Sequence, residues 1–430
     1  MFDFDFVAAQ RPLPPYREPP LSTKSAQNGL RPVWLEPDYL PRGPHVYGRE
    51  VDRFEKPEDE PSPGELVEVF DDRDRFMGHG LYNPYSDIRV RWISRGRRKD
   101  LDRPREFFQR VIANADRMRR KGLRLEDVTD TYRIVHAEGD SLPGLIVDRL
   151  GDVLVCEYHS LGFWYLREEI EFALGQLYRG MLVLHKVARL ARKHEGFSDD
   201  IPTIIASDGR SQDDLERLNV EITERGIRHR VQPGLGHKTG WFCDQRDNRA
   251  RVAELVKGRE MLDLCCNAGG FALQAAKAGA RHVTAVDLDE VVLDKAVWAA
   301  EKNDLAVDFV HEDTFRYCRG LLSGTARPEV VVLDPHKIVA SRHGLEDGLV
   351  TYGDMNHLAI SCVRKGGFLA TFSCSGALDL PTFLGMVFQS ARRAERDVRL
   401  LEILGASPDH PQRPDFPRSR YLKGALLSVD

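Results

Sequence analysis

Helical and strand patterns alternate from about Arg246 onward in this chain of 430 residues. The strand segments EMLDLCC, HVTAVDLD and EVVVLDP are continuously apolar, and helical segments such as GFALQAAKAG lie among them. A strand that is apolar on both faces needs cover on both faces, and parallel strands need long crossover connections, which helices provide. The pattern therefore predicts a Rossmann-like α/β domain, with a parallel, doubly wound sheet.

Three segments precede this domain, which we place at residues 218–430. Residues 1–32 are polar, proline-rich and aperiodic, which predicts a flexible tail. Residues 33–97 contain short alternating runs separated by turns such as FDDRDRF, which predict a small β domain. Residues 98–217 combine strand-like runs with helical ones, which predicts a central α+β domain.

The composition restricts the location of the protein and its metal chemistry. No run of about 18 apolar residues is present, and the first residues, MFDFDF, are acidic where a signal peptide is basic. We therefore expect a cytoplasmic protein that does not associate with a membrane. Its seven cysteines include no CxxC pair, so we expect reduced thiols and no metal site.

Basic residues are concentrated between Arg89 and Arg124, although the net charge of the whole chain is −5. This segment has 14 Lys or Arg against four Asp or Glu, an excess of ten positive charges. Such a patch beside a small β domain favours contact with RNA, and a solvated helix face is the alternative. The predicted RNA-binding residues are Arg89, Arg91, Arg97, Arg98 and Lys99.

A nucleotide site is predicted where the first two strands of the α/β domain end. The first strand runs into DLCCNAGGF, in which Gly269 and Gly270 allow a tight turn. The second ends at Asp287, 18 residues after Gly269, where a carboxylate can accept two hydrogen bonds from a ribose. The turn lacks the GxGxxG pattern that binds a pyrophosphate. S-adenosylmethionine (SAM) therefore fits better than NAD, which remains the alternative.

The segment TFSCSG closes a later strand of the same sheet and places Cys374 on the ligand side. A thiolate that adds to carbon 6 of a pyrimidine turns the ring into an enamine, which can attack an electrophilic methyl group. Asp334, at another strand end, is the candidate to protonate or hydrogen-bond ring nitrogen 3. A buried structural cysteine is the alternative for Cys374. We interpret three other cysteines as core residues: Cys265, Cys266 and Cys362.

Several motifs, in one order along the chain, resemble the RlmI-like family of 23S ribosomal RNA cytosine-5 methyltransferases. They are GHKTGWFCDQRDNR, DLCCNAGGF, AVDLD, LDPHK, TFSCSG and YLKG. The segment from Pro63 to Arg95 resembles that family's PUA domain, and the segment YRIVHAEGDSLPGLIVDRLGDVLV resembles its central domain. The resemblance implies a class I methyltransferase domain, SAM as cofactor and structured RNA, in particular large-subunit ribosomal RNA, as substrate.

The resemblance also implies roles for individual residues, with Cys374 as the nucleophile. It assigns the ribose contact to Asp287 and the adenine contact to Asp313. The remaining cofactor contacts that it implies are Phe242, Asp244, Arg246, Asp263, Asn267, Gly269 and Phe271. One departure is His336, which stands where the family has a second proline. His336 could alter base choice or accept a proton, or it could be a tolerated substitution.

Three functions remain in competition at this point. The first is formation of 5-methylcytosine in RNA through a covalent adduct with Cys374. The second is methylation of a base amine, which needs no thiol and prefers a [DN]PP[YF] segment that this chain lacks. The third is a non-catalytic RNA-binding assembly factor that retains the SAM fold. A homodimer is an oligomeric state that the sequence leaves open.

Overall fold

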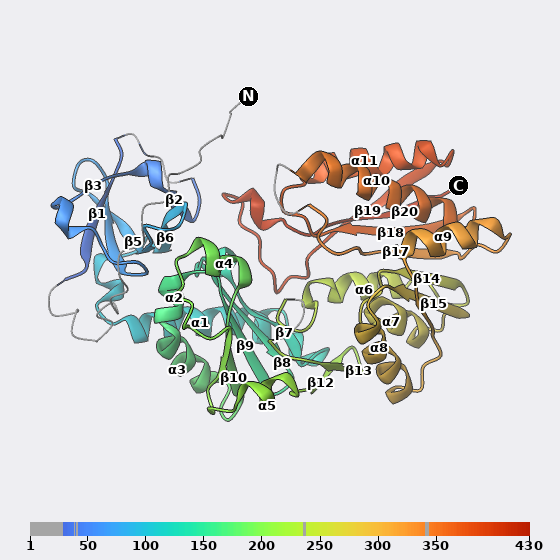
Figure 1. Ribbon diagram of the computed structural model, residues 1–430, viewed down its shortest axis with the longest axis horizontal. Helices are drawn as coiled ribbons and strands as arrows, with labels where there is room; N and C mark the ends of the chain where they lie inside the picture. Colours follow the sequence, from blue (N-terminus) through green and yellow to red (C-terminus); the bar gives the residue numbers. More distant parts are fainter. Residues whose placement is uncertain (1–28, 38, 40–41, 235–237, 340–343) are drawn as a thin grey trace.

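The computed structural model describes residues 29–37, 39, 42–234, 238–339 and 344–430. Most of the predicted flexible tail, residues 1–28, lies outside the described residues. Strand β1 begins at Arg31, so the last two residues of the predicted tail belong to a strand. Three regions follow one another along the longest axis of the molecule (Figure 1).

The N-terminal region is a six-stranded sheet in the order β2-β6-β5-β4-β1-β3. The turn predicted at FDDRDRF joins β4 to β5, which pair in antiparallel fashion. Apolar residues from several strands form its core, including Val33, Val67 and Val90. The strands are β1 (Arg31–Leu35), β2 (His45–Tyr47), β3 (Val51–Phe54), β4 (Leu66–Phe70), β5 (Phe76–Tyr82) and β6 (Ile88–Ser94).

The central region has a five-stranded sheet in the order β11-β10-β9-β8-β7, with a separate hairpin of β12 and β13. Helix α1 begins with Pro104, a residue suited to the first turn because its missing N–H would have no partner there. The strands are β7 (Thr131–His136), β8 (Leu145–Leu150), β9 (Val153–Tyr158), β10 (Leu182–Val187), β11 (Ile204–Ala206), β12 (Val220–Glu224) and β13 (Ile227–Val231). The helices are α1 (Pro104–Arg117), α2 (Leu161–Tyr165), α3 (Arg167–Leu177), α4 (Arg189–His194) and α5 (Gln212–Glu216).

The C-terminal region is a seven-stranded sheet in the order β16-β15-β14-β17-β18-β20-β19. Helices α7 and α8 lie near β14 and β15, whereas α10 and α11 lie on the opposite side of the sheet (Figure 1). The strands are β14 (Glu260–Leu264), β15 (His282–Asp287), β16 (Asp308–His311), β17 (Val330–Leu333), β18 (Gly367–Ser373), β19 (Val398–Gly405) and β20 (Lys423–Val429). The helices are α6 (Arg246–Ala253), α7 (Gly270–Lys277), α8 (Glu290–Lys302), α9 (Thr314–Ser323), α10 (Leu345–Cys362) and α11 (Leu380–Arg393).

The predicted parallel sheet is correct for the strands from β16 to β18, all of which pair in parallel. The last two strands differ, because β20 runs antiparallel to β18, and β19 runs antiparallel to β20. The alternating pattern did not predict these two strands because no helix separates them. Their addition extends the sheet beyond β18 and places β20 directly beside Cys374.

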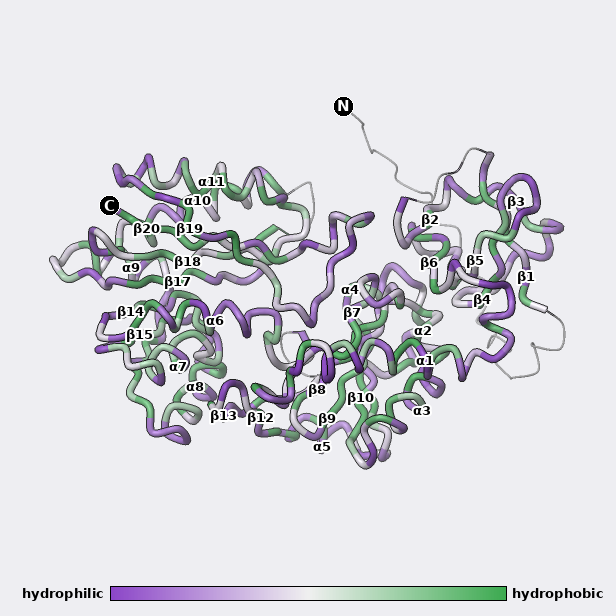
Figure 2. Tube along the Cα trace, turned by 180° about the vertical axis from the view of Figure 1, so that it is seen from behind, coloured by the Kyte–Doolittle hydropathy of each residue, from purple (hydrophilic) through white to green (hydrophobic). Residues whose placement is uncertain are grey.

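The hydropathy of the chain follows these layers. In Figure 2 the strands of the central sheet and β17 and β18 are largely hydrophobic, whereas the solvent-facing turns are hydrophilic. Leu262, Leu333 and Leu369 belong to one buried cluster between the C-terminal sheet and its helices. Within the described part of the chain, no helix is both long enough and apolar enough to cross a membrane.

Candidate active site

The carboxyl ends of neighbouring parallel strands meet at one edge of the C-terminal sheet. Leu264 of β14 pairs with Val286 of β15 on one side and with Leu333 of β17 on the other, and Leu333 pairs with Thr371 of β18. Open parallel sheets bind ligands beyond this edge. The residues that follow these aligned positions are Cys265, Asp287, Asp334 and, three residues beyond Thr371, Cys374.

The loop after β14 turns back on itself because alternate residues adopt a left-handed backbone conformation. Cys265, Asn267 and Gly269 have φ angles of 62°, 50° and 74°. Glycine adopts this conformation without strain, and a Cβ atom at Gly269 would also meet the Cβ of Ala296 at 3.1 Å. The backbone N–H of Asn267 donates to Asp287 at 2.8 Å. The loop therefore exposes its backbone to a ligand beside the end of β15.

Asp263 supplies a buried carboxylate beneath this loop. Its Oδ2 accepts a hydrogen bond from the backbone N–H of Ala272 at 3.1 Å, whereas Oδ1 has no partner among the described residues. Burial, together with the carboxylates of Asp334 and Asp287, raises the pKa of Asp263 well above its usual range. A buried carboxylate oxygen without a donor favours a cationic ligand. The ammonium group of SAM fits this requirement.

Asp287 and Asp313 have carboxylate acceptor sites that the protein itself leaves unused. Each oxygen of Asp287 accepts one backbone N–H, from Asn267 at 2.8 Å and from Asp289 at 3.0 Å. A carboxylate oxygen has a second acceptor site, so a ribose diol can still donate to both oxygens. Asp313 caps α9 by accepting the backbone N–H of Arg316 at 3.0 Å through Oδ1 only. Its other oxygen can accept from an adenine amine.

We expect Asp287→Ala to weaken SAM binding about thirty-fold, which corresponds to a loss of about 2 kcal/mol for two hydrogen bonds to a charged acceptor. Isothermal titration calorimetry measures this loss. Asp289→Ala is the matched control, because Asp289 is an exposed acid that caps α8 through Val291 and Val292. The control should lose about 1 kcal/mol of folding stability but keep its SAM affinity. An unchanged affinity in Asp287→Ala would contradict the assignment.

Cys374 follows β18 as a half-buried residue among charged side chains. Burial, and secondarily the carboxylate of Asp334, raises the pKa of the Cys374 thiol, while the ammonium of Lys238 opposes that rise. Burial also raises the pKa of Asp334 to about 6, with a further contribution from Asp244. Gln245 donates to Asp334 at 2.8 Å. Asp334 is therefore a carboxyl group that can hold a proton near neutral pH.

Lys423, in the YLKG segment, is a buried cation beside Cys374 that the sequence did not assign to the site. The first residue of β20, it pairs with Ser373 of β18 and is only 3% exposed. Its ammonium donates to the carbonyl oxygens of Ser375 at 2.6 Å and Tyr421 at 2.7 Å. Burial lowers the pKa of Lys423 to about 8, although the negative charge of an ionised Cys374 opposes that fall. The ammonium can therefore stabilise a Cys374 thiolate.

Known proteins match this chain over both its terminal regions and over almost its full length. A PUA-like domain matches residues 38–95, and an S-adenosylmethionine-dependent methyltransferase domain matches residues 201–412. Ribosomal RNA large subunit methyltransferase I of Pseudoalteromonas atlantica is 34% identical over 369 residues, which cover 85% of this chain and 91% of that protein. The enzyme of the same name from Photobacterium profundum is 34% identical over 391 residues, covering 90% and 96% of the two chains.

The chain belongs to the ribosomal RNA large subunit methyltransferase I family. It is a SAM-dependent methyltransferase with an N-terminal PUA-like domain, as predicted. A solved structure from Streptococcus mutans, described as a candidate SAM-dependent methyltransferase, has the same fold, with a TM-score of 0.75 and 19% identity over 93% of this chain and 100% of that one. A second structure, a methyltransferase in complex with S-adenosylhomocysteine, has a TM-score of 0.73 at 18% identity over 94% and 97% of the two chains.

Two of the predicted cofactor contacts need correction, because other residues of the protein already occupy the side chains. Arg246 is fully buried, and its guanidinium donates to Asp409 at 2.9 and 3.1 Å. Its role is to anchor the segment that contains Asp409. The ring of Phe271 packs in the core against Phe372, with ring centroids 5.6 Å apart. Only the main chain of Phe271 can therefore contact a cofactor.

The other two residues predicted from the WFCDQR segment, Phe242 and Asp244, lie beside Lys238. The Lys238 ammonium is 4.5 Å from the ring centroid of Phe242 and 2.5 Å from Asp244. Asp244 also accepts from the hydroxyl of Tyr421 at 2.6 Å. These pairs connect the segment to the surroundings of Cys374. Leu288 follows Asp287, and its side chain is 66% exposed. It offers an apolar surface on which the ring of a bound nucleoside can pack, and no motif in the sequence indicated this residue.

The predicted RNA-binding arginines are mostly occupied by contacts within the protein. Arg91 is buried and donates to Glu195 at 2.7 Å, so its assignment as an RNA contact is wrong. Arg98 pairs with Glu68 through two bonds of 2.6 Å, and Arg89 donates to the carbonyl oxygens of Asn83 and Pro84. A guanidinium that is already bonded to carboxylates or carbonyl oxygens of the protein is poorly placed to bind a phosphate.

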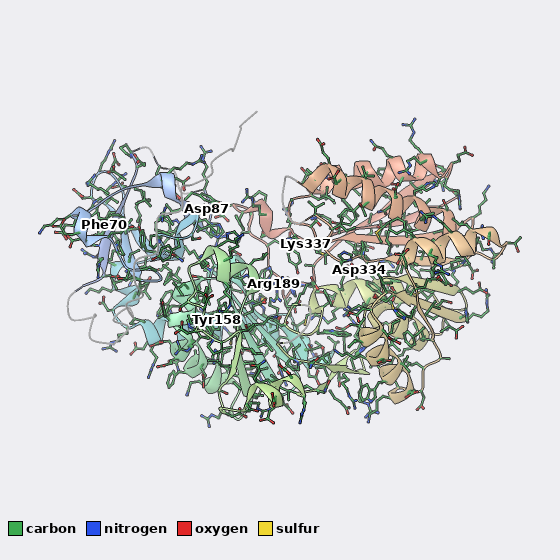
Figure 3. The ribbon with its side chains drawn as sticks, viewed as in Figure 1. Phe70, Asp87, Tyr158, Arg189, Asp334 and Lys337 are labelled. Carbon is green, nitrogen blue, oxygen red and sulfur yellow. The ribbon has the colours of Figure 1, made fainter. Side chains whose placement is uncertain are left out.

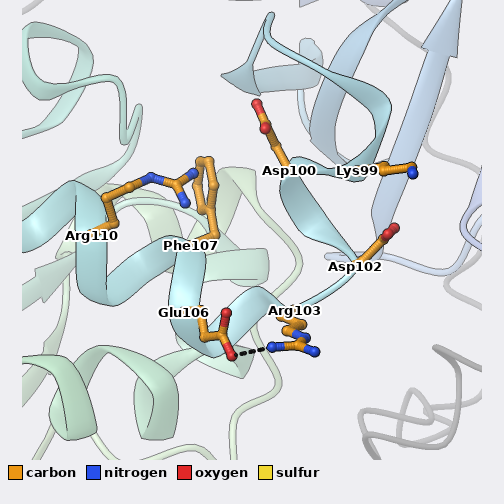
Figure 4. Close-up of a pocket in the computed structure, with 7 residues that line it drawn as sticks. All are labelled: Lys99, Asp100, Asp102, Arg103, Glu106, Phe107 and Arg110. Atoms are coloured by element: carbon orange, nitrogen blue, oxygen red, sulfur yellow. Dashed lines mark hydrogen bonds and ion pairs between the residues drawn. The ribbon is translucent and has the colours of Figure 1, made fainter.

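Arg97 and Lys99 remain exposed, and neither side chain has a partner among the described residues. Figure 4 shows Lys99 beside a cavity of about 250 Å³. The cavity lies next to the start of α1, where Arg103 donates to Glu106 at 2.9 Å. Asp100 and Asp102 also line it, but neither forms an ion pair with Lys99. Both residues remain predicted RNA contacts.

All seven cysteines are free. Cys266 and Cys362 are buried, and Cys265 is half-buried with its sulfur 3.4 Å from the hydroxyl of Thr314. Within the described residues, no group of three or more His, Cys, Asp or Glu side chains is arranged to hold a metal ion.

Proposed function

We propose that this protein methylates carbon 5 of a cytosine in large-subunit ribosomal RNA, with Cys374 as the nucleophile. The observation that supports this most is the position of Cys374 at the carboxyl edge of the sheet, near the carboxyl group of Asp334 and the ammonium groups of Lys238 and Lys423. Methylation of a base amine needs no thiol, so that reaction would not explain why Cys374 lies near Asp334 and Lys423. The names of the relatives support ribosomal RNA as the substrate.

The first step is addition of the Cys374 thiolate to carbon 6 of the cytosine. A carbon–sulfur bond forms, and the electron pair of the carbon 5–carbon 6 double bond moves into the ring. The raised pKa of Cys374 makes the thiolate scarce near neutral pH. The nearby ammonium of Lys423 favours ionisation of the thiol, and its two carbonyl partners hold it in place.

Asp334 balances the charge that develops on the ring during this addition. A protonated Asp334 can donate to ring nitrogen 3, which becomes more basic as the sulfur adds. Its pKa of about 6 leaves a minor protonated fraction at neutral pH, and hydrogen bonding to the ring would increase that fraction. The amide of Gln245 holds the other side of this carboxyl group.

The bound SAM supplies an electrophilic methyl group. Carbon 5 of the cytosine attacks that methyl: the new carbon–carbon bond replaces the methyl–sulfur bond of SAM, and the electron pair of the broken bond stays on sulfur, which leaves S-adenosylhomocysteine. A base then takes the proton of carbon 5, the ring double bond re-forms, and the Cys374 thiolate leaves. Within the protein, Asp263, Asp287 and Asp313 are the residues that would hold the cofactor at the strand edge.

Bisulfite sequencing tests the proposal. An unmodified transcript of large-subunit ribosomal RNA is incubated with SAM and the protein, and a single cytosine should become resistant to conversion. Omitting SAM gives the control reaction. Methyl transfer that leaves every cytosine convertible would contradict methylation at carbon 5 and would favour a different target atom.

The same proposal includes two predictions about the protein as a whole. One copy of the chain contains Cys374, Asp334 and Asp287, so the reaction needs no second copy. A homodimer stays a prediction. Size-exclusion chromatography with light scattering tests it. The cytoplasm also stays the predicted compartment.

A further inference from the structure

Helix α4 connects the PUA-like domain to the surroundings of Cys374. At its C-terminal end, Glu195 accepts hydrogen bonds from Asn83 at 3.1 Å and from Arg91 at 2.7 Å, both in the N-terminal region. At its other end, Lys186 of β10 lies three residues before α4 and donates to the carbonyl oxygen of Lys238. Lys238 in turn is paired with Asp244 beside Cys374. The six-residue helix therefore lies between the two regions.

The exposed face of α4 is cationic and has no acidic partner. Arg189 and Lys193 are exposed, and neither side chain has a hydrogen bond or ion pair within the described part of the chain. They are four residues apart on one helix, so they lie on the same face and repel each other. Leu190, next to Arg189, is 71% exposed. An anionic ligand would relieve the repulsion.

Two of the acidic residues near α4 are already neutralised, whereas Asp199 and Asp200, beyond its C-terminal end, are exposed and have no ion pair within the described residues. Glu195 is buried against Arg91, and Glu157 lies 3.5 Å from Lys186. The α4 face thus differs from the Arg89–Arg124 segment, in which most arginines are occupied. In the view of Figure 3, Arg189 lies between Tyr158 of the central region and the pair Asp334 and Lys337. Lys337 is exposed as well and likewise has no partner there.

We infer that the α4 face, defined by Arg189, Leu190 and Lys193, binds the phosphate backbone of the RNA substrate between the PUA-like domain and Cys374. RNA is favoured over an acidic protein because the regions at both ends of α4 belong to an RNA-directed enzyme. An RNA strand that contacts both the PUA-like domain and the surroundings of Cys374 runs past α4. The inference therefore rests on the proposed function. Phosphate contacts of this kind position an RNA without reading its sequence.

The test compares charge-reversal variants in filter binding of an unmodified large-subunit ribosomal RNA transcript over a series of salt concentrations. Arg189→Glu/Lys193→Glu should weaken binding about tenfold. It should also lower by about 1.5 the salt slope, which is the steepness with which the logarithm of the binding constant falls with the logarithm of the salt concentration, because each lost phosphate contact removes about 0.7 to 0.9 from that slope. Arg189→Gln/Lys193→Gln, which removes the charges without reversing them, should give a smaller change in the same direction.

Lys257→Glu/Lys365→Glu is the matched control. Both lysines are exposed and lie just before β14 and β18, at the edge of the C-terminal sheet opposite the one that carries Cys374. This control should bind RNA like the unaltered protein. All variants should retain their SAM affinity and melting temperature, and saturating RNA should restore methylation in the α4 variants. A salt slope and affinity in both α4 variants equal to those of the unaltered protein would overturn the inference. Failure of the proposed function would differ, since the unaltered protein itself would then leave cytosine unmethylated.

Discussion

Cys374→Ser should lower the methylation rate at least about ten-thousandfold while SAM affinity and melting temperature stay near those of the unaltered protein. The reason is ionisation. A serine hydroxyl has almost no ionised form near pH 7, whereas a thiol retains a small reactive fraction even when its pKa is raised. Loss of a covalent nucleophile removes most of an enzyme's rate. The substitution keeps nearly the same size at a half-buried position, so packing should change little.

A trapping experiment measures the same step directly. RNA that contains 5-fluorocytosine at the target should accumulate a covalent adduct with the unaltered protein, because fluorine cannot leave as a proton does. Cys374→Ser should form none. Cys156→Ser is the control, since Cys156 is fully buried in the central region. That variant should lose stability because it buries a hydroxyl, yet retain its rate per folded molecule. Continued methylation by Cys374→Ser would show that Cys374 is only a packing residue.

Lys423→Met should lower the methylation rate about a hundredfold below pH 8. A hundredfold loss corresponds to about 3 kcal/mol, which is of the order that a neighbouring unit charge contributes at an effective dielectric constant of about 20. The sign of the pH dependence follows from the pKa of about 8 for Lys423. Below that pH the ammonium stabilises the thiolate, and above it the cation is lost. The difference between the unaltered protein and Lys423→Met should therefore shrink as the pH rises beyond 8.

Alkylation of Cys374 by iodoacetamide, followed by mass spectrometry across a pH series, reports this effect without RNA. Lys423→Met should shift the alkylation profile of Cys374 to higher pH. Lys423→Arg keeps the positive charge and should restore most of the shift, which a purely structural role for Lys423 would not produce. Identical alkylation profiles in the unaltered protein and Lys423→Met would show that Lys423 does not act through the thiol.

The periodicity of the sequence was sufficient to predict the fold class and the strand edge at which we propose that the cofactor binds. Continuous apolar strands separated by helices predicted the parallel strands that end at Asp287, Asp334 and near Cys374, and the structure confirms those ends. Such patterns are local, because the apolar residues of each strand by themselves indicate that the strand is buried. The antiparallel strands β19 and β20 were missed because no α-helix lies between them, so the alternating pattern stops at α11, just before β19.

Only the tertiary structure decided which charges are available for chemistry. Arg246 lies in a motif shared with the family, yet Asp409, 163 residues away, holds its guanidinium. Arg91 belongs to the most basic segment of the chain, yet Glu195, 104 residues away, occupies it. Lys423 becomes a neighbour of Cys374 only because β20 pairs with β18. The sequence by itself determined the backbone pattern and the residue types at the strand ends, since both depend on neighbouring positions. The pairing of charges depends on contacts between distant segments, so it arises only when the sheets and domains pack together.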